Sequence, residues 1–223
     1  MSLPDVVRVH PGPLAGEVVV PGDKSLSHRA LLLGAQVGTP VVVTGVAASG
    51  DARSTAACLA TLGAAVDLHA DDHGNLAGTV TGPVREADDV LDCGNAGTGM
   101  RLLAGVVAGI DGVAVLTGDV SLRRRPMGRV AEPLRAMGAR VDGRDDGRLP
   151  PLVVRGGGLR GITWDSPVAS AQVKSCLLLA GLRADGPTTV RSPGPSRDHS
   201  ERLLAHLGAR LESSRRDDGA EVV

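Results

Sequence analysis

The chain has 223 residues, a formal net charge of −1, and neither phenylalanine nor tyrosine. The near-zero charge and the missing aromatic stacking platforms argue against a nucleic-acid partner. No apolar run reaches the roughly 18 residues that a membrane-spanning helix needs, and the first residues lack a basic flank and an apolar signal core, so we expect no membrane partner.

The three cysteines, Cys58, Cys93 and Cys176, are widely spaced and odd in number. This spacing excludes a metal knuckle and is typical of a reducing compartment. We therefore expect buried thiols, a cytoplasmic location, no metal site and no cofactor.

The first third of the chain predicts an order of helices and strands that recurs later in the chain. In chain order we expect a helix, a strand, a second helix and two strands, over residues 27–36, 41–45, 52–62, 65–68 and 79–81. Asp51 is a good N-cap for the second helix, and Gly63 ends it.

The same order of predicted helices and strands recurs twice. Its second copy predicts elements over 98–108, 113–117, 127–137, 140–142 and 152–155, and its third copy over 171–182, 188–192, 198–207 and 210–213. In each copy a hydrophobic-Gly-Ala sequence ends the second helix, at Leu62-Gly-Ala64, Met137-Gly-Ala139 and Leu207-Gly-Ala209. This internal repeat predicts three strand-helix-strand-helix-strand-strand units, over about 18–85, 86–158 and 159–223. The first helices are apolar over most of their circumference, so we expect them at the centre.

The candidate ligand-binding residues lie at the N-terminal ends of the predicted helices, which we call the helix openings. Pro21-Gly-Asp-Lys-Ser25 places Lys24 and Ser25 at a helix N-terminus, where free N–H groups and the helix dipole favour an anion, and Arg29 lies one turn further along. The alternative is a capped helix with a solvated lysine.

The other openings repeat this design. Gly97 lies in the small-residue turn Gly94-Asn-Ala-Gly-Thr98, where Asn95 or Thr98 could cap a helix or touch a ligand. Ser170-Ala171-Gln172 opens the third unit, with an ordinary N-cap as the alternative. Arg125 ends a run of three arginines and Arg197 precedes the last helix, positions where an anion would offset the unfavourable helix dipole. The alternative for the arginine run is a solvated basic loop. Together these openings predict a small, phosphorylated ligand.

Four segments resemble the 5-enolpyruvylshikimate-3-phosphate synthase family. They are Pro21-Gly-Asp-Lys-Ser-Leu-Ser-His-Arg-Ala-Leu-Leu-Leu33, Gly94-Asn-Ala-Gly-Thr98, Arg125-Pro-Met-Gly128 and Ser196-Arg-Asp-His199. They stand in family order, and the resemblance covers about residues 18–209. Ser170-Ala-Gln-Val-Lys-Ser175 and the Ser-Arg-Asp-His form are similar to the bacterial branch called class II.

This resemblance implies an activity and a fold. The family transfers the enolpyruvyl group of phosphoenolpyruvate to the 5-hydroxyl of shikimate 3-phosphate and releases phosphate. Its fold is the inverse α/β prism, with helices inside, sheets outside and three βαβαββ repeats in each of two domains.

The resemblance also implies site roles. Shikimate 3-phosphate would be bound by Lys24, Ser25, Arg29, Ser170, Ala171, Gln172 and Arg197. Phosphoenolpyruvate would face Lys24, Gly97, Arg125 and Gln172. Lys24 and Arg125 would act in catalysis by stabilising charge in the transition state. Ala171 stands where some members have a second serine.

Full family members are about twice as long, so the resemblance implies an amino-terminal half that is inactive alone. The second domain of the same enzyme would be its partner, and residues 1–17 would pack with that domain. One alternative is the UDP-N-acetylglucosamine enolpyruvyl transferase, which usually opens with Lys-Asn where this chain has Lys24-Ser25. The other is a short, non-catalytic paralogue that binds a phosphorylated ligand.

Overall fold

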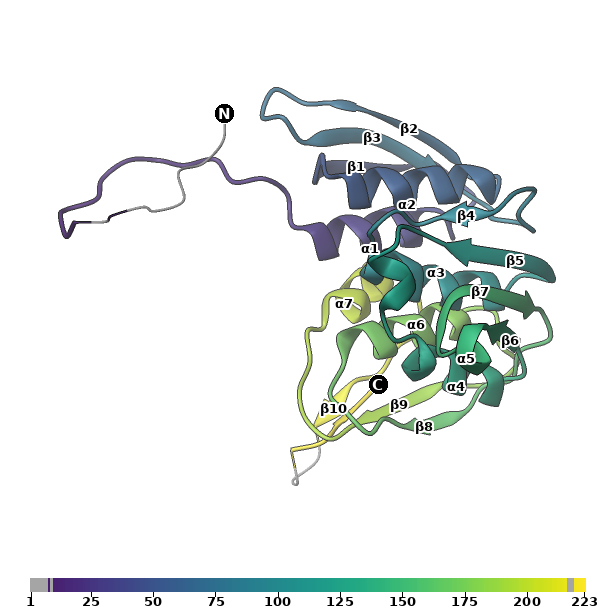
Figure 1. Cartoon of the computed structure of the whole chain (residues 1–223). Helices are drawn as coiled ribbons and strands as arrows, with labels where there is room; N and C mark the ends of the chain where they lie inside the picture. Colours follow the sequence, from purple (N-terminus) through teal and green to yellow (C-terminus); the bar gives the residue numbers. More distant parts are fainter. Residues whose placement is uncertain (1–7, 9, 216–218) are drawn as a thin grey trace.

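The computed structural model describes residues 8, 10–215 and 219–223. Within these residues, three sheets surround a central group of helices (Figure 1). The arrangement is the inverse α/β prism that the family resemblance implies, with the apolar helices inside, as the repeat predicts, and the sheets outside. The unit boundaries near residues 85 and 158 stay a prediction.

The first unit contains two helices, α1 (Lys24–Gly34) and α2 (Gly50–Thr61). Its strands are β1 (Val41–Val46), β2 (Ala65–Ala70) and β3 (Leu76–Thr81). They form an antiparallel sheet in the order β1-β3-β2, so the last strand of the unit is the central one.

The second unit contains α3 (Gly97–Ala108), the 3-10 helix η1 (Leu122–Arg124), α4 (Gly128–Ala136) and the short α5 (Arg144–Gly147). Its sheet has the order β4-β5-β7-β6, from strands β4 (Leu91–Asp92), β5 (Gly112–Thr117), β6 (Arg140–Gly143) and β7 (Leu149–Gly156). Again the last strand lies between the two strands with which it is antiparallel.

The third unit contains α6 (Ala171–Gly181) and α7 (His199–His206). Its sheet has the order β10-β11-β9-β8, from strands β8 (Thr163–Asp165), β9 (Thr189–Ser192), β10 (Ser214–Arg215) and β11 (Glu221–Val222). The order repeats that of the other units, but the last two strands are much shorter.

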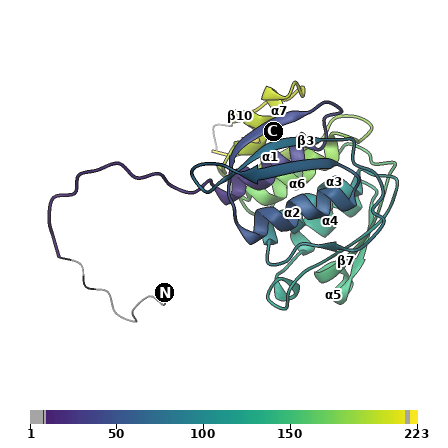
Figure 2. The ribbon, with the colours of Figure 1, turned by 90° about the horizontal axis from the view of Figure 1, so that it is seen from above.

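Three sequence predictions are wrong in detail. No strand precedes α1, because the described residues 10–20 are exposed and extend away from the body without a pairing partner (Figures 1 and 2). The strand predicted at 210–213 begins only at Ser214, because β11 pairs with Ser214 and Arg215 alone. The N-cap of α2 is Ser49, whose hydroxyl accepts from the Ala52 N–H, and not Asp51.

The prediction that residues 1–17 pack with a second domain concerns residues of which 1–7 and 9 lie outside the described part of the chain. Residues 8 and 10–17 are exposed and belong to no helix or strand. The packing itself stays a prediction.

Close packing of helices builds the core. α3 and α6 approach so closely that a Cβ added to Gly105 would lie 2.2 Å from the carbonyl oxygen of Cys176. The predicted burial of Cys58, Cys93 and Cys176 is confirmed. With small residues at the contact, the backbones of the two helices meet where aromatic side chains would hold them apart.

We predict that Gly105→Ala lowers the free energy of unfolding by about 1–3 kcal/mol, because its methyl group would overlap the α6 backbone. Gly50→Ala is the matched control, since nothing lies within 4 Å of its added Cβ and alanine favours the helix. Urea denaturation of both variants checks this. Equal stability of the two variants would contradict the close contact.

Candidate functional site

The first helix begins at a turn that is fixed from two sides. The Gly22 N–H donates to Asn75 Oδ1 at 2.8 Å, and a Cβ at Gly22 would lie 2.0 Å from the Gly45 carbonyl oxygen. Asp23 caps α1, because its Oδ1 accepts from the Leu26 N–H at 2.7 Å. The opening of α1 is therefore held in one place before any ligand arrives.

Lys24 is the exposed cation of this opening. Its Nζ lies 2.9 Å from Asp51 Oδ2, and its side chain is 57% exposed. Asp51 is thus the ion-pair partner of Lys24 and has no capping role. Because an exposed ion pair contributes about 0–1 kcal/mol, an anion can compete for Lys24 at small cost.

Arg29 is a buried cation held by neutral groups. It is 3% exposed, and its guanidinium donates to the Ser200 and Ser175 hydroxyls, each at 2.8 Å, and to the Ser25 carbonyl at 3.0 Å. Those two hydroxyls lie 2.6 Å apart and join α6 to α7. Among the described residues, no ion pair includes Arg29.

A second buried arginine joins the openings of α3 and α6. Arg101, on α3, donates to Gln172 Oε1 at 2.9 Å and to the Pro126 carbonyl at 2.9 Å. Gln172 in turn donates through Nε2 to Thr98 Oγ1 at 2.9 Å. Three segments far apart in sequence, around residues 98, 126 and 172, therefore meet at one point.

Arg125 lies directly against the α3 opening. It donates to Asn95 Oδ1, and Asn95 donates to Asp119 Oδ2 at 2.6 Å, a bond that holds the pKa of Asp119 below its usual value. A Cβ at Gly97 would lie 2.8 Å from Arg125 Nη1, so any larger residue displaces this guanidinium. Neither Asn95 nor Thr98 caps α3, whose N-cap is Ala96.

The third opening combines a capped helix with an exposed cation. The Ser170 hydroxyl caps α6 by accepting from the Val173 N–H at 3.4 Å, as expected if this serine is an ordinary N-cap. The Ala171 carbonyl accepts from the Ser175 hydroxyl at 2.5 Å and from Arg29 Nη2 at 3.5 Å. Arg197 is exposed just before α7.

The two buried arginines, Arg29 and Arg101, each lie near other arginines. Burial lowers the pKa of Arg29 and the charge of Arg197 lowers it further, whereas the charges of Glu201 and Asp23 raise it. Burial likewise lowers the pKa of Arg101 to about 10, with added repulsion from Arg129 and Arg125. Mutual repulsion of this kind shows that the arginines lie near one another, and an anion among them would relieve it.

The structure brings most of the predicted site residues into two clusters. Ser25, Arg29 and Ala171 meet between α1 and α6, whereas Gly97, Arg125 and Gln172 gather around the α3 opening. Lys24 lies at the same opening as Ser25 but pairs with α2. The roles of these residues toward substrates stay predictions.

Sequence reasoning missed the side chains that support these clusters, namely Arg101, Ser175 and Ser200. Arg101 was detectable, because a single charge interrupts the apolar run of α3. The serines give no such signal, since their neighbours come from other helices.

Two negative findings apply to the described residues. No three histidine, cysteine, aspartate or glutamate side chains in this part of the chain lie close enough to hold a metal ion. None of its helices combines the length and the apolar character that crossing a membrane requires.

Sequence comparison identifies relatives over nearly the whole chain. Residues 9–222 match the family model of EPSP synthase (3-phosphoshikimate 1-carboxyvinyltransferase). The 3-phosphoshikimate 1-carboxyvinyltransferase of Anaeromyxobacter dehalogenans is 54% identical over 91% of this chain and 46% of its own length. That of Thermus thermophilus is 55% identical over 93% of this chain and 49% of its own length. The chain therefore spans about half the length of the curated relatives it matches.

Structural comparison agrees. The EPSP synthase of Acinetobacter baumannii superposes with a TM-score of 0.82 and 39% identity, over 93% of this chain and 46% of that protein. The enolpyruvyl transferase NikO of Streptomyces tendae gives a TM-score of 0.61 at 17% identity, over 96% of this chain and 49% of that protein. The second likeness concerns the fold alone.

His28, beneath the α1 opening, predicts a pH-dependent stability. Its side chain is fully buried, its Nδ1 lies 2.8 Å from Thr55 Oγ1, and burial lowers its pKa from 6.5 to about 4. The unfolded chain binds this proton below pH 6.5 and the folded chain only near pH 4. Stability is therefore complete above pH 6.5 and falls by up to about 3 kcal/mol as the pH drops to 4.

The measurement is urea denaturation between pH 4 and 7.5. We expect His28→Gln to remove most of this pH-dependent loss, whereas His73→Gln, at an exposed histidine, keeps it. An unchanged slope in His28→Gln would show that other groups cause the pH dependence.

Proposed function

The chain belongs to the EPSP synthase family, and on this premise we propose that it binds the phosphorylated substrates of an enolpyruvyl transfer. The reaction moves the enolpyruvyl group of phosphoenolpyruvate to the 5-hydroxyl of shikimate 3-phosphate and releases phosphate, a step of aromatic amino-acid biosynthesis. Because the chain spans about half of its relatives, we propose that it supplies one substrate-binding half of the enzyme.

The environment of Arg29 is the observation that carries this proposal. A guanidinium that is 3% exposed, donates only to hydroxyl and carbonyl oxygens and forms no ion pair within the described residues has lost its hydration, and only the more distant charges of Glu201 and Asp23 offset its own. Such burial is costly unless an anion is paired with it. A phosphate near Arg29 and Arg197 would supply that charge, and the 3-phosphate of shikimate 3-phosphate is the group we assign there.

The second cluster suits the smaller substrate. Because Gly97 has no side chain, the Arg125 guanidinium packs directly over the N-terminus of α3, where a carboxylate or phosphate could contact both. Gln172, already oriented by Arg101 and Thr98, offers an amide between the two clusters. We propose that phosphoenolpyruvate lies here.

Catalysis requires that charge be stabilised as it develops. The 5-hydroxyl adds to the phosphate-bearing carbon of phosphoenolpyruvate while the methylene carbon gains a proton and the hydroxyl loses one, which forms a tetrahedral intermediate. Phosphate then leaves with its negative charge, and loss of a proton from the methyl group restores the double bond. Lys24, freed from Asp51, and Arg125 would stabilise that charge in the transition state.

The remaining half of the enzyme is the macromolecular partner we propose, because the relatives are about twice as long as this chain. We propose a cytoplasmic location. The three free, buried cysteines support a reducing compartment.

We predict that Arg197→Gln weakens binding of shikimate 3-phosphate about 10-fold, because one charge-assisted contact to the phosphate is lost. Isothermal titration calorimetry at low salt, with shikimate as the phosphate-free ligand, measures this. Arg202→Gln is the matched control, since it removes the same charge from an exposed position on α7. Equal weakening by both variants would indicate a general charge effect, and no phosphate-dependent binding by the parent chain would contradict the proposal.

We further predict that the 223-residue chain alone releases no phosphate from phosphoenolpyruvate and shikimate 3-phosphate, because half of the enzyme must close over the substrates. A phosphate-release assay checks this at enzyme concentrations high enough to see a single turnover. Sustained turnover by the chain alone would refute the assignment to a binding half.

A further inference from the structure

Three buried charged side chains from α6, α7 and β11 form an ion cluster beside the Arg29 site. Lys174 of α6 is the only cation among them, and its Nζ forms ion pairs with Glu201 of α7 and, at 2.7 Å, with Glu221 of β11. One ammonium therefore faces two carboxylates, and the cluster holds more negative than positive charge.

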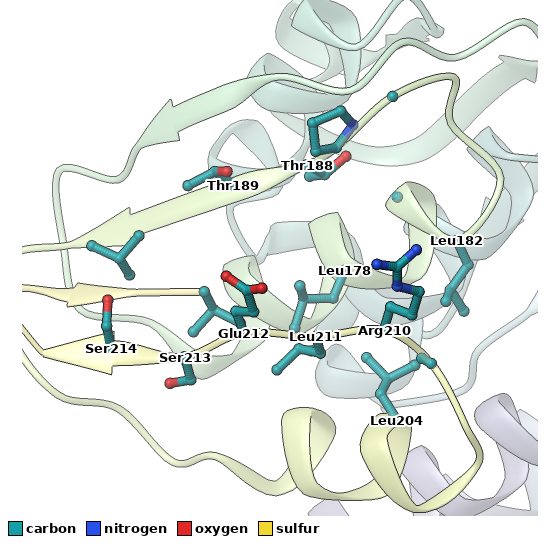
Figure 3. Close-up of a pocket in the computed structure, with 16 residues that line it drawn as sticks. Leu178, Leu182, Thr188, Thr189, Leu204, Arg210, Leu211, Glu212, Ser213 and Ser214 are labelled. Carbon is teal, nitrogen blue, oxygen red and sulfur yellow. The ribbon is translucent and has the colours of Figure 1, made fainter.

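The ion cluster is closed to solvent. Lys174 is 1% exposed, and the side chains of Glu201 and Glu221 are also largely buried. One helical turn further along α6 and α7, Leu178 and Leu204 line an open groove, but neither Lys174 nor Glu201 borders it (Figure 3). Because water screens these charges little, removing one of them changes the interactions of the others strongly.

Glu201 lies next to the groups that hold Arg29. The preceding residue on α7, Ser200, accepts from Arg29 Nε at 2.8 Å. Burial lowers the pKa of Arg29, whereas the charge of Glu201 raises it, so the two charges act on each other. Glu201 Oε2 is buried and has no hydrogen-bond partner among the described residues. The carboxylate thus has an acceptor to spare and the guanidinium lacks an ion-pair partner, yet the two do not pair.

α6 explains why they stay apart. Its consecutive residues Lys174 and Ser175 mirror Ser200 and Glu201 of α7, since each helix contributes one hydroxyl and one charge. The two hydroxyls accept from Arg29, and the two charges bind each other. A buried carboxylate and a buried guanidinium attract strongly, so a competing cation is required to keep them separate.

We propose that Lys174 is a positioning residue of the phosphate site, because it holds Glu201 in an ion pair and so keeps Arg29 free for the phosphate of the substrate. Without Lys174, the Glu201 carboxylate turns to Arg29, neutralises the guanidinium and repels the incoming phosphate. This inference rests on the proposed function, which assigns the 3-phosphate of shikimate 3-phosphate to Arg29.

Calorimetric titration of the 223-residue chain with shikimate 3-phosphate tests the proposal. We expect Lys174→Met to weaken binding about 10-fold or more, because the charge-assisted contact of Arg29 is lost to Glu201. Adding Glu201→Gln to Lys174→Met should restore most of the affinity. The matched control adds Glu221→Gln instead, which removes a carboxylate from β11 and should restore nothing. Equal rescue by both second substitutions, or rescue by neither, would overturn the proposal.

Glu201→Gln alone gives a test that keeps the second ion pair of Lys174, with Glu221, and so does not depend on the folding of Lys174→Met. We expect this variant to bind shikimate 3-phosphate at least as tightly as the parent chain, because Glu201 competes for Arg29 and does not contribute to binding. Weaker binding would show that the ion cluster only supports the local fold, and the proposal would be wrong.

A measurement without substrate separates this inference from the proposed function. The ¹H–¹⁵N signals of the Arg29 guanidinium, assigned by their loss in Arg29→Lys, report whether it donates to a hydroxyl or to a carboxylate. We expect a downfield proton shift in Lys174→Met that Glu201→Gln reverses, since a carboxylate is the stronger acceptor. Unchanged signals would overturn the inference. A parent chain that shows this shift but no phosphate-dependent binding would contradict the proposed function alone.

Discussion

The close contact between α3 and α6 is the constraint on which the candidate site depends. Gly105 lets the two helix backbones meet at Cys176, and this contact sets the distance between their openings. At that distance Arg101, on α3, reaches Gln172 on α6. A side chain at residue 105 would separate the helices, and the network that orients Gln172 would be lost. Helix packing in the centre thus controls polar geometry at the edge.

The buried cations of this fold differ in whether their bonding partners are charged or neutral. Lys174, 1% exposed, is paired with the carboxylates of Glu201 and Glu221, so its charge is compensated within the protein. Arg29 and Arg101 are also buried, yet their bonds go to neutral oxygens. A buried charge is tolerated best with an opposite charge beside it. Within the described residues neither arginine forms an ion pair, whereas Lys174 forms two, and Glu201 of that cluster still acts on Arg29 through its charge.

The structural cluster also connects the third sheet to the candidate site. Glu221 lies on β11, bonds Lys174 at 2.7 Å, and accepts from the Ser196 hydroxyl at 3.3 Å, next to Arg197. Strand β11 therefore contacts the loop that carries a predicted phosphate-binding arginine. The position of that loop depends on the third sheet as well as on α7.

The sequence by itself determined most of the order of helices and strands, the central place of the apolar helices, the cationic openings and the family. These are local signals, since periodicity, glycine stops and charged turns lie within a few residues of the features they specify. Only the tertiary structure decided that Asp51 pairs with Lys24, that Arg29 forms no ion pair within the described residues, and that residues 10–20 and 210–213 form no strand. A strand exists only with a hydrogen-bonded neighbour, and a buried charge is defined by residues that fold against it, so neither can be read from the adjacent sequence.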